Sequence, residues 1–271
     1  MSRCYESCRY PNAFRYLAAA VFAVFCAGGC EDRRPWPGSK PMTAEEKAEA
    51  DARTLKALRA RDAAYEILNL PEVRILLDEE TAEVTGIDVT DSSDHSPFVD
   101  TEMVSIRKID DEVLERFKNF PHLVSLKLNG TAITDDGLAH LATLRRLRNL
   151  NLSNTAVTDV GVMHLKRLTK LQTISLTSTS VGDGALETIG GLPDMREIRV
   201  ANTKVTDAGL SHLKNPLLNE ISFHDTAVTD EGLRHLAELQ NLLRVKAGNT
   251  SVTDEGIDAL QAALPACKIS W

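Results

Sequence analysis

Four histidines recur at one position of an internal repeat, directly before the second leucine of an apolar segment. Imidazoles in a row could hold a metal ion. The row consists of His140, His164, His212 and His235. Two copies of the repeat carry Thr188 and Ala259 instead, and no Cys or paired carboxylate accompanies the histidines. The spacing favours surface histidines that pack on their neighbours, so we expect no metal site.

Six aspartates also recur at one position, and carboxylates are the ligands that calcium prefers. The row consists of Asp135, Asp159, Asp183, Asp207, Asp230 and Asp254. Each aspartate falls at the start of a short predicted helix, where a negative charge offsets the positive end of the helix dipole. We therefore interpret the row as charges that stabilise helix starts, in preference to a calcium site.

Motifs of catalysis are missing from the sequence. It contains no Gly-x-Ser-x-Gly, no phosphate-binding loop, no His-Glu-x-x-His and no dinucleotide-binding glycine pattern. Ser and Thr are abundant, but none stands beside a plausible base at a position where the repeat breaks. We expect no catalytic residue and no cofactor, and the prediction is a protein that is not an enzyme.

The repeat itself predicts the strands and helices that would position these residues. Its copies begin at Leu123, Leu147, Leu171, Met195, Leu218 and Leu242. Each copy opens with Leu-x-x-Leu-x-Leu, whose alternation predicts a short strand, and continues with leucines spaced by three, which predicts a short helix. One strand and one helix of this size cannot enclose a core, whereas stacked copies can.

Each predicted helix begins after a threonine whose hydroxyl could cap the first free amides. These threonines are Thr134, Thr158, Thr206, Thr229 and Thr253.

The pattern Leu-x-x-Leu-x-Leu-x-x-Thr-x-Ile-Thr-Asp-x-Gly-Leu resembles bacterial leucine-rich repeat proteins, related to the cysteine-containing and ribonuclease-inhibitor-like repeats. The match covers residues 84–271. The resemblance implies an α/β fold, a right-handed solenoid with parallel strands on its concave side, and a binding role without a reaction. The ninth position carries Thr131, Thr155, Thr179, Thr203, Thr226 and Thr250. Their buried hydroxyls could satisfy loop backbone groups between neighbouring coils.

We divide the repeat region into a degenerate first coil at 84–122, six regular coils at 123–265 and a terminal strand at 266–271. In the terminal strand, Trp271 is expected to cover the open end of the core. An N-terminal cap at 43–83 is predicted to hold a helix from Thr43 to about Asn69, after which a hairpin leads into the first coil.

The degenerate coil carries an insertion at 90–107 that contains Asp91, Asp94, His95, Asp100 and Glu102. Such a set could bind a divalent cation or could form an acidic solvated loop. Both readings stay open at this stage.

Residues 1–29 have the pattern of a signal peptide, with three arginines ahead of an apolar run that is short for a membrane helix. The run ends Ala27-Gly28-Gly29-Cys30, which looks like the lipobox of a bacterial lipoprotein. We expect lipidation at Cys30, with plain secretion as the alternative, and a proline-rich tether at 30–42. Cys267 would then be the one other cysteine in the exported chain, so no internal disulfide is predicted.

The net charge of −8 would become two units more negative after removal of the signal, and such an acidic chain is a poor general ligand for nucleic acid.

The outward positions of the predicted strands are free to vary, because the coil does not use them. The middle column reads Lys127, Asn151, Ser175, Arg199, Ser222 and Lys246, with His224 beside it. This column is neutral or basic within an acidic chain, which favours an acidic or hydroxyl-rich partner. The alternative is that short polar residues are simply what a solvated parallel sheet tolerates.

The leading interpretation is a non-catalytic binding module of the bacterial envelope, anchored by lipid, that recognises a protein, peptide or glycan on the concave face. A self-assembling structural envelope protein is the alternative. A target adaptor of the ubiquitin-ligase type is a third reading, which the export signal disfavours.

Overall fold

The computed structural model describes residues 44–68, 74–78, 81–88 and 109–271. The chain divides into two compact units, Met1–Ala60 and Arg61–Trp271. The predicted signal segment, the tether with Cys30 and the insertion at 90–107 lie outside the described residues. Among the described residues, no helix has both the length and the apolar character needed to cross a membrane.

Helix α2 (Ala44–Leu68) forms where the sequence predicts the cap helix. Near its C-terminal end, Ala64 is buried in the hydrophobic core of the second unit. Strand β1 (Arg74–Leu77) then pairs antiparallel with β2 (Val84–Asp88), which is the hairpin predicted for this segment.

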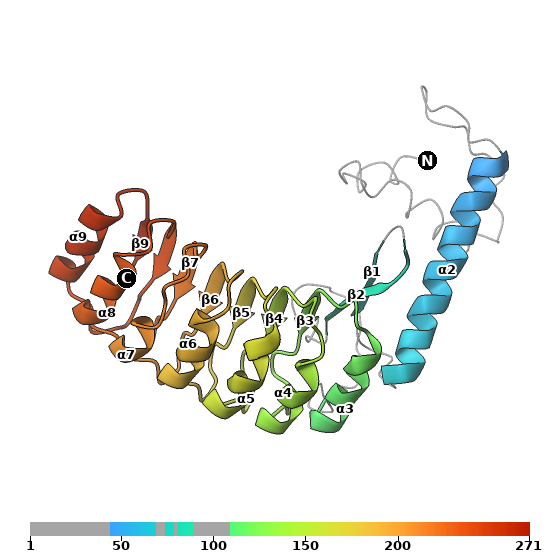
Figure 1. Cartoon of the computed structure of the whole chain (residues 1–271), viewed down its shortest axis with the longest axis horizontal. Helices are drawn as coiled ribbons and strands as arrows, with labels where there is room; N and C mark the ends of the chain where they lie inside the picture. The colour runs from blue at the N-terminus through green and yellow to red at the C-terminus, as the bar shows by residue number, and fades with distance from the viewer. Residues whose placement is uncertain (1–43, 69–73, 79–80, 89–108) are drawn as a thin grey trace, which may run out of the picture. The chain divides into compact units, whose positions relative to one another are not determined.

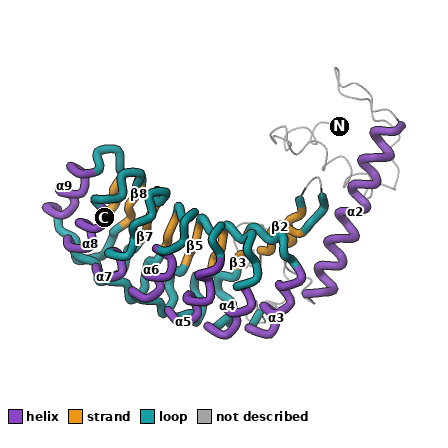
Figure 2. The backbone as a smooth tube through the Cα atoms, viewed as in Figure 1, coloured by secondary structure: helices purple, strands orange, loops and turns teal. Residues whose placement is uncertain are grey.

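From β2 onward the strands are parallel and in register. The described residues form one sheet in the order β1 to β9. The remaining strands are β3 (Ser125–Lys127), β4 (Asn149–Asn151), β5 (Thr173–Ser175), β6 (Glu197–Arg199), β7 (Glu220–Ser222), β8 (Arg244–Lys246) and β9 (Lys268–Ser270). Within the second unit the strands line the inner side of a curved solenoid and the helices form its outer side (Figures 1 and 2). This is the α/β leucine-rich repeat solenoid that the sequence predicts.

The helices of the outer side are short. They are α3 (Asp111–Arg116), α4 (Asp135–Leu141), α5 (Asp159–Met163), α6 (Asp183–Gly190), α7 (Asp207–Leu210), α8 (Asp230–Leu236) and α9 (Asp254–Ala263), with 3-10 turns η3 (Phe117–Asn119) and η4 (His164–Arg167). Helices this short are marginal alone, so their stability comes from packing against neighbouring coils.

The core is a column of aliphatic side chains that point inward from the strands. Its strand members are Leu126, Leu150, Ile174, Ile198, Ile221 and Val245, each aligned on the one before and each at most 2% exposed. Full burial of such a side chain contributes roughly 1.5–3 kcal/mol. The column continues from coil to coil, which is why a single copy cannot fold alone.

A position just after each strand adopts left-handed backbone geometry. Its occupants are Gly130, Asn154, Ser178, Asn202, Asp225 and Asn249, with φ between 50 and 76°. Gly, Asn and Asp tolerate this geometry, whereas Ser178 adopts it with less intrinsic preference. Their backbone N–H groups continue the pairing of the coils, as in Asn154 N–H donating to the Thr177 carbonyl at 2.9 Å.

The ninth-position threonines bond within their own coil. Each hydroxyl donates to the carbonyl three residues earlier at 2.6–2.7 Å, for example Thr155 to Leu152. The prediction that they bond between neighbouring coils was therefore wrong. The local bond closes the turn that follows the strand, at the left-handed residue.

The coils are joined instead by what we call the Asp–Thr ladder. Five of the aspartates that begin a described helix each accept two bonds from the threonine before the next helix. The N–H group donates to Oδ1 at 2.7–2.9 Å and the hydroxyl donates to Oδ2 at 2.6–2.8 Å. The pairs are Asp111–Thr134, Asp135–Thr158, Asp183–Thr206, Asp207–Thr229 and Asp230–Thr253.

The capping prediction holds in part. Thr158, Thr206, Thr229 and Thr253 also accept a bond from a helical amide, whereas Thr134 makes no such bond. The hydroxyl of Thr134 is used by the ladder alone. The sequence predicted the local cap and missed the bond between coils.

The repeated glycine makes room for the ladder. A Cβ at Gly161 would lie 2.3 Å from Asp135 Oδ1, and one at Gly256 would lie 2.1 Å from Asp230 Oδ1. The carboxylate of one coil therefore occupies the space that a side chain of the next coil would need. This explains why Gly follows two residues after the aspartate in most copies.

One rung of the ladder differs. Gly182 stands where the other coils have threonine, so Asp159 Oδ1 accepts from Gly182 N–H at 2.7 Å and from Ala185 N–H at 3.1 Å. No hydroxyl reaches this carboxylate from position 182. Ala185 also stands here where the other copies have glycine.

The last rung uses a different donor. Asp254 Oδ1 accepts from the indole N–H of Trp271 at 3.3 Å, where a following coil would supply threonine. Trp271 is 60% exposed. The expectation that its indole covers the open end of the core was wrong, because the ring lies over the ladder.

Candidate ligand-binding face

The concave face consists of the outward side chains of the parallel strands, two from each strand. The register places the predicted middle column on this face, in line from β3 to β8. Lys127, Arg199 and Lys246 are exposed, and Asn151 is half-buried. Ser175 and Ser222 are 6% and 3% exposed, so these two serines offer a partner little surface.

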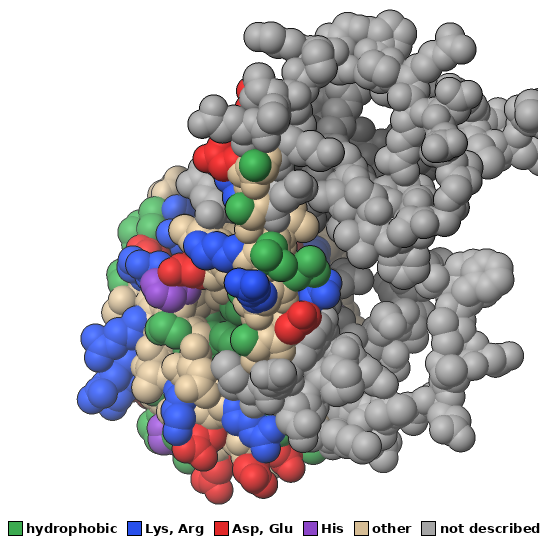
Figure 3. Space-filling view, turned by 90° about the vertical axis from the view of Figure 1, so that its right-hand side faces the viewer, with side chains coloured by type: hydrophobic (Ala, Val, Ile, Leu, Met, Phe, Trp, Pro, Cys, Tyr) green, Lys and Arg blue, Asp and Glu red, His purple; other side chains and the backbone are tan. Residues whose placement is uncertain are grey.

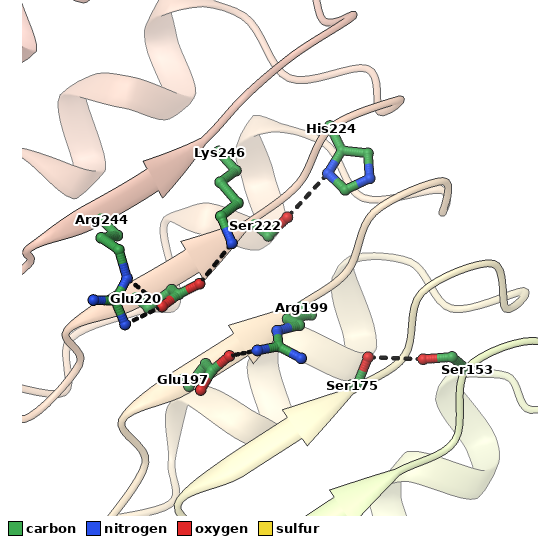
Figure 4. A network of polar contacts seen from close by, with 9 residues as sticks. All are labelled: Ser153, Ser175, Glu197, Arg199, Glu220, Ser222, His224, Arg244 and Lys246. Atoms are coloured by element: carbon green, nitrogen blue, oxygen red, sulfur yellow. Dashed lines mark hydrogen bonds and ion pairs between the residues drawn. The ribbon is translucent and has the colours of Figure 1, made fainter. Parts of the chain in front are cut away.

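Strands β4 and β5 carry a hydroxyl and amide network. The hydroxyls of Ser153 and Ser175 lie 2.7 Å apart (Figure 4), and the Ser153 hydroxyl donates to Asn151 Oδ1 at 2.7 Å. Asn151 also donates to Asn129 Oδ1 at 3.4 Å. These groups satisfy one another, which fixes the side chains of this part of the face.

Strands β6 to β8 carry ion pairs. Figure 4 shows Glu220 between Arg244 and Lys246, whose Nζ lies 2.9 Å from Glu220 Oε1, while Arg199 pairs with Glu197. The Glu220 side chain is only 4% exposed and its two cationic partners are about half exposed. One buried carboxylate therefore pairs with two partly exposed cationic side chains and fixes their positions at the surface.

Burial raises the pKa of Glu220, but hydrogen bonds from Lys246 and Arg244 and their positive charges outweigh it. The net effect holds the pKa of this carboxyl below its ordinary value. Glu220 is ionised at neutral pH and keeps both cations paired.

The remaining cation of the middle column is paired as well. Lys127 Nζ lies 2.8 Å from Asp88 Oδ2, one strand away on β2. Every cation of the column thus has a carboxylate beside it. The column therefore carries less net positive charge than its own residues suggest. The compensating carboxylates lie at neighbouring outward positions that do not belong to the column.

A serine and a histidine meet on this face. The Ser222 hydroxyl lies 3.0 Å from His224 Nδ1 (Figure 4). The expectation that no Ser stands beside a plausible base concerned positions where the repeat breaks, whereas Ser222 is a regular position of strand β7. A nucleophile needs access and an oriented base. Ser222 is 3% exposed, and no carboxylate among the described residues bonds to the other ring nitrogen of His224.

Metal ligands do not gather in the part of the chain that the structure describes, where no three His, Cys, Asp or Glu side chains form a site. Of the histidine row, His164 and His212 are exposed and His140 and His235 are half-buried on the outer side. Cys267 is buried and unpaired, and burial raises the pKa of its thiol. A raised pKa disfavours the reactive thiolate.

Glu197, Glu220 and Arg244 also occupy outward positions of their strands, and the predicted site did not include them. The structure makes them part of the same polar clusters as Arg199 and Lys246. The signal was present in the register, because Glu220 and Arg244 are directly opposite in paired strands. Cross-strand opposite charges of this kind attract.

A family model described as "Leucine Rich repeat" matches residues 121–142. No curated protein matches the chain. Among solved structures, internalin C2 of Listeria monocytogenes is similar with a TM-score of 0.49 and 25% identity, over 59% of this chain and 64% of that chain. An internalin (inlF) of the same species is similar at 0.41 and 18%, over 62% and 64%.

The plant peptide hormone receptor RGFR1, solved in complex with RGF2, is similar with a TM-score of 0.41 and 16% identity, over 58% of this chain and 29% of the receptor. This chain spans less than two thirds of the length of each of these proteins.

Proposed function

We propose that the chain is a non-catalytic binding module of the bacterial envelope, which recognises a protein, peptide or glycan on its concave face. One observation carries this proposal. The inward leucines, the ladder and the turn residues repeat from coil to coil, while the concave residues change from strand to strand. Variation along one extended surface is how repeat proteins encode a partner.

Export and lipid anchoring belong to the same proposal. The support is the sequence Ala27-Gly28-Gly29-Cys30 after an apolar run and ahead of the proline-rich tether. Full-length protein and Cys30→Ser are expressed in a bacterial host and partitioned in detergent. We expect the parent in the detergent phase and the variant in the aqueous phase. Equal aqueous recovery of both after signal cleavage would refute the anchor.

The concave ligand is tested with the full chain as bait in a pull-down from envelope extract. The residues proposed to meet it are Lys127, Asn151, Ser175, Arg199, Ser222, His224 and Lys246. Because Lys246 contacts the buried Glu220, neutral replacement is cleaner than charge reversal, which would set two carboxylates together. Arg199→Gln with Lys246→Gln should keep the circular dichroism spectrum and lower the recovery of the partner.

The matched control is Lys204→Gln with Lys214→Gln, two exposed cations away from the concave face. Equal loss in both variants would show a general charge effect and remove the concave face from the proposal. The alternative, a self-assembling structural protein, predicts a solution mass that rises with concentration in the absence of any ligand.

A further inference from the structure

A second set of cations lies on the flank where helices lead back into strands. We call Arg145, Arg146, Arg148, Lys166, Arg167 and Lys170 the basic flank. All six side chains are exposed. Lys166 and Arg167 lie in η4, and the other four follow α4 or η4 in the same two consecutive coils. These coils are joined here by Gln172 N–H donating to the Arg148 carbonyl at 2.8 Å. Figure 3 shows Lys and Arg side chains at the left edge of the described surface as well as nearer its middle and base.

The basic flank differs from the concave face in whether its cations are paired with carboxylates. Arg146 lies 2.7 Å from His122 Nδ1. The other five make no side-chain hydrogen bond or ion pair with any residue that the structure describes. On the concave face, by contrast, Lys127, Arg199 and Lys246 each have a carboxylate beside them. The flank therefore presents uncompensated charge and the concave face does not.

The repeat does not require these cations. The position of Arg146 and Lys170 becomes Asp194, Leu217 and Asn241 in the next three coils. Cations near a helix C-terminus stabilise the helix dipole by about 0.3–1 kcal/mol. If that were their purpose, the later coils would carry as many cations, whereas they carry fewer, among them Arg196 and Lys214 at the positions of Arg148 and Lys166. The charge is concentrated in two coils, as expected for a local contact with another molecule.

The basic flank also contains a hollow of about 350 Å³ between the end of α4 and the start of η4. Its apolar lining is Ala142 and Met163, and its polar lining is His164, Lys166 and Arg167. Met163 is 51% exposed. The hollow can take an apolar side chain while the cations around it meet carboxylates on either side of that side chain.

We propose that the basic flank binds an acidic protein segment that inserts an apolar side chain over Met163. The surface is separate from the proposed concave site. An anionic bilayer or a nucleic acid duplex is less suited, because such a large anionic surface is repelled by the net charge of −8. A short segment senses chiefly the charges within a screening length of about 8 Å.

The test uses the full chain and a labelled peptide of glutamates interspersed with leucines, followed by fluorescence anisotropy. A peptide with glutamine in place of glutamate is the charge control. We expect the acidic peptide to bind, the control peptide to bind about tenfold more weakly or not at all, and added salt to weaken the acidic peptide.

Two variants with equal change of charge locate the site. Arg148→Glu with Lys170→Glu should weaken the acidic peptide by about tenfold. Lys204→Glu with Lys214→Glu should change the affinity by less than about twofold, because these lysines lie outside the basic flank. Met163→Ser should weaken binding by a few-fold, roughly the effect of losing one apolar contact. Circular dichroism verifies that each variant is folded.

Equal weakening by the two double variants would overturn the proposal, since it would reflect net charge alone. Loss of binding in Arg199→Gln with Lys246→Gln, with the flank variant unaffected, would reassign the peptide to the concave face. Binding to phosphatidylglycerol vesicles or duplex DNA in place of the peptide would replace the protein partner with that other class. If no ligand binds the concave face but the acidic peptide binds as expected, the proposal for the basic flank remains supported independently of the concave site.

Discussion

The Asp–Thr ladder and the concave face use similar polar residues for different purposes. In the ladder, Asp and Thr repeat at fixed positions and every carboxylate is partnered by the next coil. On the concave face the residues change from strand to strand, and pairing occurs in clusters of two or three, as around Glu220. Regular polar pairing joins the coils, while irregular pairing shapes the surface that we propose a partner meets.

The two regions also differ in what surrounds the carboxylate. The ladder aspartates accept backbone N–H groups and hydroxyls, so they hold the chain itself. The concave Glu197 and Glu220 hold long side chains, which a ligand can displace without disturbing the backbone. We therefore expect loss of stability from changes in the ladder and loss of binding from changes on the concave face.

The largest effect tests the register on which the comparison depends. Leu152 is fully buried, so Leu152→Ala should lower the free energy of unfolding by about 2–5 kcal/mol. His164→Ala, on the exposed outer side, should change it by less than about 1 kcal/mol. Urea unfolding measures both. Similar midpoints would mean that the inward and outward positions have been misassigned.

The next effect tests the ladder directly. Asp207 accepts from Thr229 N–H at 2.8 Å, from the Thr229 hydroxyl at 2.7 Å and from Gly232 N–H at 3.0 Å. Asp207→Ala should therefore cost about 1.5–3 kcal/mol. Asp258→Ala removes an exposed aspartate that makes no described bond and should stay within about 0.5 kcal/mol. Equal losses of unfolding free energy in the two variants would show that the ladder does not stabilise the fold.

A smaller effect is expected from the concave cluster, and it depends on pH. The pKa of Glu220 is lowered from 4.5, so its contribution is complete above that pH and is lost as pH falls through the lower folded value. At pH 7, Glu220→Gln should cost about 1–2 kcal/mol. The difference from the parent should shrink in acid. Glu238→Gln, an exposed control, should not show this cost.

The smallest effect repairs the odd rung. A Cβ at Gly182 would lie 3.4 Å from Asp159 Oδ2, an ordinary contact. Gly182→Thr should therefore add the missing hydroxyl bond and stabilise the chain by about 1 kcal/mol. Gly182→Ala supplies the backbone effect without the hydroxyl and serves as the control. A threonine no better than alanine would show that the hydroxyl bond does not stabilise the coil joint.

The fold could be predicted because its signal is repeated. Leu126, Leu150 and their counterparts recur with the spacing of a strand, and the register that follows from them is the one observed. The hairpin before the first coil was also predictable, from two apolar arms around an acidic turn. Such patterns depend on the side-chain period alone.

Contacts between residues far apart in sequence were harder to predict. Asp207 and Thr229 were each given a local role at a helix start, because single helices explain both residue types. The exposed Trp271 was misjudged for a similar reason. Its position in the alternation of the terminal strand suggested an inward side chain, and its bond to Asp254 forms only once the last coil has folded. The pairing of Lys127 with Asp88 likewise requires knowledge of which strands are neighbours.

The odd rung at Gly182 also bears on how the solenoid resists force. Rungs linked in series carry the same applied tension. Among the described rungs between regular coils, the one at Asp159 lacks a threonine hydroxyl bond, so it should part first. Pulling on the two ends of the repeat region should therefore open it between the coils of Asp159 and Gly182. A rupture that begins elsewhere in single-molecule extension would show that the rungs do not limit mechanical strength.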